Sequence, residues 1–87
     1  AAAVQAVLPA DDSTMVEALA FRVMPKYHIE VKMGAEANSK KKGQLPPGLV
    51  VRVLEREVDK HGRLVKIRFE QTIRATAPAT GWIKIRS

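Results

Sequence analysis

Cysteine is absent from this chain of 87 residues, so no disulfide and no thiolate metal site supports its fold. We expect a reducing compartment such as the cytoplasm, because cysteine is absent and the apolar N-terminal stretch does not fit the pattern of a signal peptide. Apolar runs are also short, and none approaches the roughly 20 residues that a membrane-spanning helix requires. We therefore expect one small domain without a membrane span, and the start at Ala1 leads us to expect a module of a larger protein.

Catalytic motifs are equally scarce. The two histidines, His28 and His61, stand far apart in the chain, and there is no cysteine nucleophile, no His-x-x-x-His metal spacing and no glycine-rich phosphate loop. The acidic pair Asp11 and Asp12 lies in a predicted linker, where its carboxylates have no fixed geometry. We therefore expect no enzymatic activity, no metal and no cofactor.

Positive charge is what the chain has in excess. Fifteen Lys and Arg against nine Asp and Glu give a formal net charge of +6, and the first basic residue is Arg22. The folded part is therefore more basic than the chain average, which favours an acidic partner such as an acidic protein face, nucleic acid or anionic lipid. The alternative interpretation is that the charge mainly keeps a small domain soluble.

Five segments alternate apolar and polar residues with the period of a β-strand. They are residues 19–24, 28–33, 49–57, 63–70 and 81–85. In the fourth segment the alternation predicts that Ile67 and Phe69 face inward and that Leu64 faces outward, and in the second it places Met33 on the buried face. Five short strands indicate a small all-β barrel or sandwich.

Turn chemistry separates these segments. Pro47-Gly48 suits the central positions of a type II turn, because Pro fixes φ near −65° and Gly supplies a positive φ. The stretch 59–62, Asp-Lys-His-Gly, is typical of a hairpin turn. Residues 34–44 and 72–80 are predicted to be long surface loops.

The N-terminal residues 1–14 are predicted to form a flexible tail or linker, because they are alanine-rich and then hold Pro, Asp and Ser. The domain itself is expected to span residues 15–87. Thr14 and Glu17 have the spacing of a capping box, which indicates a short helical turn near residues 15–19.

Four short motifs occur in an order that resembles the Src-homology-3-like (SH3-like) barrels, closest to the bacterial-type branch of that superfamily. They are Val31 to Gly34, Leu45 to Leu54, Val65 to Ile67, and Gly81 to Ile83. The resemblance covers residues 19–86 and implies a five-stranded antiparallel barrel. The tyrosine-rich strand and the acidic loop of the proline-peptide-binding members are absent, so binding of proline-rich peptides is not implied.

Our principal functional hypothesis is a non-catalytic interaction module that docks an acidic protein partner through loops 34–44 and 72–80. Exposed aromatics between these loops would contact the partner, and a lysine triplet would steer it electrostatically. The residues predicted to bind the partner are Tyr27, Lys40, Lys41, Lys42 and Trp82. The alternative interpretation of Trp82 is structural, as a side chain that packs across the barrel edge.

Two alternative functions follow from other residues. A nucleic-acid-binding barrel would use a cationic face composed of Lys66, Arg68, Lys84 and Arg86, if their strands are neighbours. The same residues are also compatible with an ordinary solvated face whose cations pair with Glu55 or Glu70. A cell-wall or glycan-binding module would instead depend on the two exposed aromatics, Tyr27 and Trp82.

Overall fold

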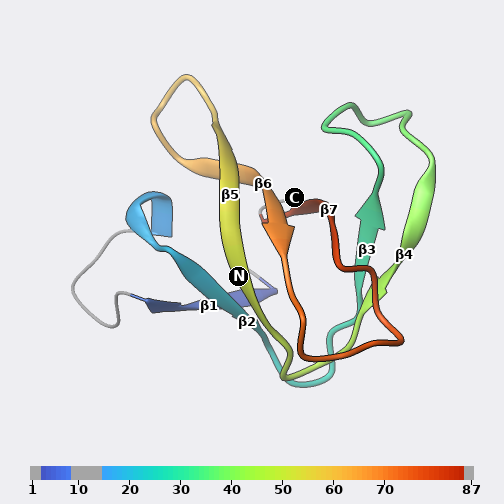
Figure 1. The fold of residues 1–87 in the computed structure, drawn as a ribbon. Coiled ribbons are helices and arrows are strands. Elements are labelled where there is room, and N and C mark those ends of the chain that lie inside the picture. Colours follow the sequence, from blue (N-terminus) through green and yellow to red (C-terminus); the bar gives the residue numbers. More distant parts are fainter. Residues whose placement is uncertain (1–2, 9–14, 86–87) are drawn as a thin grey trace.

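The computed structural model describes residues 3–8 and 15–85, and within them seven strands form one antiparallel sheet that is curled into a half-barrel (Figure 1). The sheet order is β1-β2-β5-β6-β7-β3-β4. The elements are β1 (Val4–Leu8), a 3₁₀ turn η1 (Met15–Glu17), β2 (Ala20–Val23), β3 (Ile29–Lys32), β4 (Lys41–Leu45), β5 (Val50–Val58), β6 (Leu64–Glu70) and β7 (Thr80–Lys84).

The all-β class is confirmed, and each of the five predicted strands is present as β2, β3, β5, β6 or β7. The predicted strand number is wrong, because the sheet has two further strands at its edges. Residues 4–8, assigned to a tail, form β1: Val4 is buried and pairs with Val23. Residues 41–44, assigned to a loop, form β4 beside β3 together with Leu45, which is fully buried.

Both edge strands were missed for the same physical reason. Alanine, lysine and glycine are poor strand formers, so their local preference predicts a tail and a loop. A neighbouring strand that offers free backbone groups, together with one buried anchor side chain, outweighs that preference. Lysines at positions 41 and 42 also suit an edge strand, because charge there discourages pairing with another chain.

The predicted turns are present. Gly48 has φ of 83°, and the amide of Leu49 donates to the carbonyl of Pro46 at 3.4 Å, as a type II turn over Pro47-Gly48 requires. Gly62 has φ of 78° in the β5–β6 hairpin. The 3₁₀ turn η1 lies where a helical turn was predicted, although its proposed cap, Thr14, lies outside the described residues.

One core fills the half-barrel, and its largest fully buried side chains are Phe21, Phe69, Leu45, Ile67, Ile83, Val23, Val31 and Val51. The predicted orientation of two side chains, outward for one and inward for the other, is wrong. Leu64 is buried, because the β5–β6 register shifts between Glu57 and Val58 and turns the start of β6 inward. Met33 is 63% exposed, because β3 ends one residue before it.

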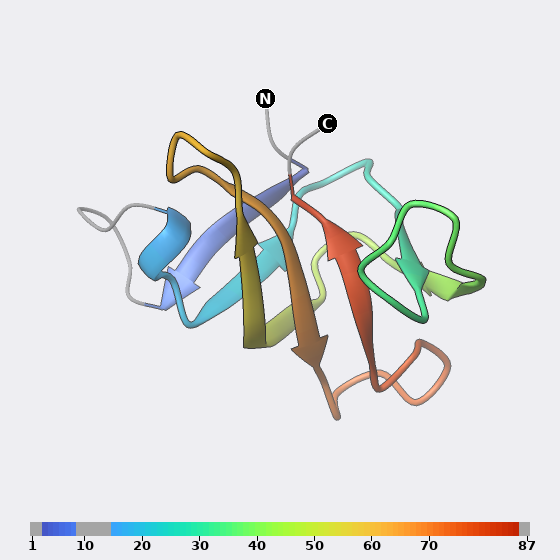
Figure 2. The same ribbon diagram turned by 90° about the horizontal axis from the view of Figure 1, so that it is seen from above.

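The two long connections lie at opposite ends of the molecule (Figure 1). Residues 33–40 join β3 to β4 at one end, and residues 71–79 join β6 to β7 at the other. Seen from above, the strands β6, β7 and β3 lie side by side (Figure 2). This triplet, with the 33–40 connection above it, carries the site described next.

Candidate functional site

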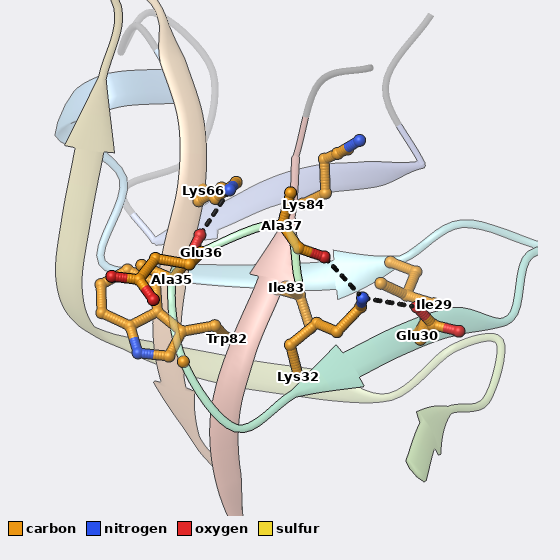
Figure 3. A pocket seen from close by; sticks show the side chains of 11 residues that line it. Ile29, Glu30, Lys32, Ala35, Glu36, Ala37, Lys66, Trp82, Ile83 and Lys84 are labelled. Carbon is orange, nitrogen blue, oxygen red and sulfur yellow. Dashed lines mark hydrogen bonds and ion pairs between the residues drawn. The ribbon is translucent and has the colours of Figure 1, made fainter. Parts of the chain in front are cut away.

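A pocket of about 440 Å³ opens on the outer face of the sheet, beside the point where β3 and β7 meet (Figure 3). Its floor is apolar and its rim carries both charges. The lining residues are Ile29, Glu30, Lys32, Gly34, Ala35, Glu36, Ala37, Lys66, Trp82, Ile83 and Lys84. Three lysines and two glutamates give this rim a net positive charge. The sequence predicted Trp82, Lys66 and Lys84 as site residues, but it did not predict that all three line one pocket.

The connection 33–40 covers one side of the pocket and is held there by two lysine ammonium groups (Figure 3). Lys66 on β6 donates to the carbonyl of Ala35. Lys32 on β3 donates to the carbonyls of Ala37 at 3.1 Å and Ser39 at 3.4 Å. Because no hydrophobic side chain of this connection enters the core, these lysine bonds are its main attachment to the sheet.

Trp82 is half-buried and lies in the centre of the outer face, between Lys32 on β3 and Arg68 on β6. Its neighbour Gly81 explains how β7 comes this close to β3. A Cβ on Gly81 would collide with Cγ1 of Val31 and would lie 3.1 Å from the carbonyl oxygen of Lys32. Gly81 therefore has a structural role, while the indole of Trp82 lines the pocket.

The predicted cationic face is present only in part. Lys66 and Lys84 are direct cross-strand partners, as expected for neighbouring strands. Arg68, however, is paired with Glu55 at 2.8 Å, and Lys66 is bonded to the 33–40 connection. Lys84 makes no side-chain hydrogen bond or ion pair with the residues that the structure describes. Arg86 lies outside the described residues.

The lysine triplet does not form one cluster. Lys41 lies opposite Lys32 and approaches Glu30 at 3.8 Å, while Glu30 also contacts Lys32 at 3.5 Å. Lys41 is thus on the face that carries the pocket. Lys42 points elsewhere, since its Cδ lies 3.7 Å from the position that a Cβ on Gly81 would occupy. Adjacent strand residues alternate in direction, which separates these two charges.

Tyr27 and Trp82 are not brought together. Tyr27 precedes β3, whereas Trp82 pairs with Lys32 at the other end of that strand. Tyr27 is 44% exposed and does not line the pocket. The two long connections also lie at opposite ends of the molecule (Figure 1).

The 71–79 connection is organised by Gln71, a residue without any distinguishing signal in the sequence. Its buried side-chain amide donates to the carbonyls of Arg74 (2.8 Å), Pro78 (3.1 Å) and Ala77 (3.2 Å). Its oxygen accepts from the amide of Arg74 at 2.8 Å. The side chain of Gln71 thus satisfies main-chain groups of this loop that have no partner strand. Ile73, in the same loop, is 71% exposed.

Asp59 has a shifted pKa, and it lies outside the residues that line the pocket. The main-chain amide of Arg63, and then that of His61, donate to the carboxylate of Asp59 and hold its pKa below the ordinary value. This is the geometry of a turn cap, not of a reactive centre. Among residues 3–8 and 15–85, no group of three or more His, Asp or Glu side chains is arranged to hold a metal ion.

No helix in the described part of the chain is long and apolar enough to cross a membrane. Comparisons with protein-family models, with curated proteins and with solved structures found no match to this chain. The half-barrel and its pocket are therefore the basis of the functional argument.

Proposed function

We propose that this chain is a non-catalytic interaction module that docks an acidic segment of a partner protein in the Trp82 pocket. The observation that carries the proposal is the composition of that pocket. The half-buried indole of Trp82 and the methyl groups of Ala35 and Ala37 offer apolar surface, and three lysines outnumber the two glutamates at the rim. The lysines are Lys32, Lys66 and Lys84. Apolar walls with a few placed charges are typical of binding sites.

Long-range charge supports the same proposal. The chain carries +6, so an acidic partner would be attracted before contact, and its association rate would fall as salt rises. Of the lysine triplet, Lys41 is on the face of the pocket and Lys42 is not. We propose that Lys41 supplies most of the steering, and that the 72–80 loop contributes little because it lies at the other end of β7.

Nucleic-acid binding is the second candidate, favoured by the adjacent pair Lys66 and Lys84. Its support is weaker than the sequence indicated. Arg68 is neutralised by Glu55, and the ammonium group of Lys66 is already bonded to Ala35. A glycan site that combines Tyr27 with Trp82 has less support still, since the two aromatics lie at opposite ends of β3.

The SH3-like assignment also belongs to this proposal. Its support is the order of the four sequence motifs, each of which lies on or beside a strand of the half-barrel. The strands β1 and β4 would then be additions to a five-stranded SH3-like arrangement.

A binding panel tests the proposal. The probes are peptides selected from a displayed random dodecapeptide library, single-stranded DNA and RNA dodecamers, and soluble peptidoglycan fragments. We expect selection of peptides rich in Asp and Glu, quenching or a spectral shift of the fluorescence of the single tryptophan on binding, and at least tenfold weaker binding by Trp82→Ala.

Lys41→Glu and Lys42→Glu form a matched pair, because both change the net charge equally on the same edge strand. We expect the first to slow peptide association about threefold or more and the second to have a smaller effect. Selection of peptides without acidic residues, binding of nucleic acid alone, or salt-independent binding of wall fragments would each contradict the proposal.

A further inference from the structure

The strands β3 and β7 are joined at a single register position. Lys32 pairs with Trp82, whereas β7 shares five register pairs with β6, and β3 shares four with β4. Continued antiparallel register would place Glu30 opposite Lys84, but no such pair forms. Instead, both residues line the pocket. The sheet is therefore split at this point, and the pocket marks the split.

A hydrogen bond between β7 and β6 establishes which backbone groups of β7 face the split. The amide of Ile85 donates to the carbonyl of Val65 on β6 at 2.8 Å. In an antiparallel pair, the amide and carbonyl of one residue point to the same side, and successive residues alternate. Ile83 and Ile85 therefore present their main-chain groups to β6, and Lys84 presents its groups to the split.

The same reasoning applies to β3. The amide of Met33 donates to the carbonyl of Lys40 at 2.9 Å, on the β4 side. Alternation then directs the main-chain groups of Val31 and Ile29 toward β4, and those of Glu30 toward β7. Glu30 and Lys84 thus offer main-chain donors and acceptors to the same gap, without a register partner among the described residues.

We infer that the partner segment docks by strand addition: a short extended peptide enters this split and hydrogen-bonds with the main chains of Lys84 and Glu30. The inference rests on the proposed function and specifies its mode. Free backbone groups along a strand edge are satisfied by an extended peptide, which supplies the same groups at the same spacing. Such pairing fixes the position of the ligand, while its side chains provide selectivity.

Side chains around the split indicate the ligand's chemistry. Cross-strand neighbours lie about 5 Å apart and diagonal neighbours about 7–8 Å apart. A ligand residue opposite Lys84 would therefore meet its ammonium group, and a carboxylate is favoured there. The diagonal neighbour is Trp82, whose indole is within reach of the same ligand face. The structure thus favours an extended segment with an acidic residue and an apolar residue two positions apart.

The test uses the tightest peptide from the displayed dodecapeptide library, and single N-methylation of each of its amides in turn. We expect one or two positions at which N-methylation weakens binding at least tenfold, because a main-chain donor is lost. We also expect the amides of Lys84 and Glu30 to gain at least tenfold protection from hydrogen exchange in the complex.

Two variants distinguish the main chain of β7 from its side chain. Lys84→Ala removes the ammonium group, and Lys84→Pro also removes the amide that faces the split, while leaving the bonds of β7 to β6 intact. Strand addition requires the proline variant to bind at least fivefold more weakly than the alanine variant. The N-methyl series decides the question if the proline variant does not fold.

The possible failures are distinguishable. If no library peptide binds, or if binding is unaffected by Trp82→Ala, the proposed function is wrong and strand addition falls with it. If a peptide binds and Trp82→Ala weakens it, but no N-methyl position changes its affinity more than about twofold, docking stands and strand addition is overturned. Unchanged exchange at Lys84 and Glu30 in a saturated complex would overturn it too.

Discussion

The ammonium group of Lys66, on β6, donates a hydrogen bond to the main-chain carbonyl of Ala35, which is 31 residues away in the connection above the pocket. No side chain of that connection belongs to the core, so this contact and those of Lys32 are its main attachment to the sheet. The side chain of Lys66 thereby links β6 to the connection 33–40, which covers one side of the pocket.

Lys66→Met keeps the aliphatic stem and removes the donor. A hydrogen bond to a charged group contributes roughly 1.5–3 kcal/mol when buried, and partial exposure reduces this to about 1 kcal/mol. We expect amide hydrogen exchange in residues 34–39 to become about fivefold faster, with little change in global stability. Lys84→Met is the matched control on the same face, and equal effects of the two variants would contradict this role for Lys66.

Gly81→Ala tests the close approach of β7 to β3. The new methyl group would collide with Val31 and press on the carbonyl of Lys32, in a backbone conformation with φ of 152°. We expect the free energy of unfolding in urea to fall by about 3 kcal/mol. Gly62→Ala should cost only about 1–2 kcal/mol, since its φ is positive but no atom lies within 4 Å of the added carbon. Equal losses would exclude packing as the cause.

Gln71→Glu tests the organiser of the 71–79 connection without changing its shape. A carboxylate cannot donate to the carbonyls of Arg74, Ala77 and Pro78, and it would place a buried charge beside them. We expect a loss of about 2–4 kcal/mol at neutral pH, measured by urea unfolding. The same change at Gln44, which is exposed on β4, should stay within about 0.5 kcal/mol. A Gln71→Glu variant as stable as that control would refute the assignment.

The pKa of Asp59 is lowered in the folded state, chiefly by the amide of Arg63. A lowered folded pKa means that the charged carboxylate stabilises the hairpin at pH values above its ordinary pKa of about 3.9. That contribution is lost as pH falls from about 4 through the folded pKa. Carbon NMR of the Asp59 carboxyl group should show the lowered midpoint, and Asp59→Asn should unfold in urea with a weaker dependence on pH below 4. An unchanged pH dependence would contradict the assignment.

Local chemistry was sufficient to predict much of the sheet. Alternation placed β2, β3, β5, β6 and β7, and Pro47-Gly48 predicted its own turn, because these signals depend on neighbouring residues alone. Edge strands are different, since β1 and β4 form where a paired neighbour and one buried anchor outweigh poor strand propensity. Leu64 also escaped prediction, because a register shift depends on the partner strand.

Several residues of the pocket were predicted as site residues, but the contacts between them were not. Trp82, Lys66 and Lys84 were selected as exposed aromatic and basic residues on neighbouring strands. Their neutralising contacts could not be foreseen, because Glu55 reaches Arg68 across a hairpin and Ala35 reaches Lys66 across 31 residues. Gln71 had no local signal at all, since its function consists of contacts with carbonyls that only the folded loop brings around it.

By itself, the sequence determined the all-β class, five of the strands, the turns and the excess of positive charge, since each depends on residue type and near-neighbour spacing. The tertiary structure alone decided that β3 and β7 meet at one position and then part, which cations remain available, and that Lys41 and Lys42 face different ways. These are long-range properties: they arise when segments far apart in the chain compete for the same backbone and charge partners.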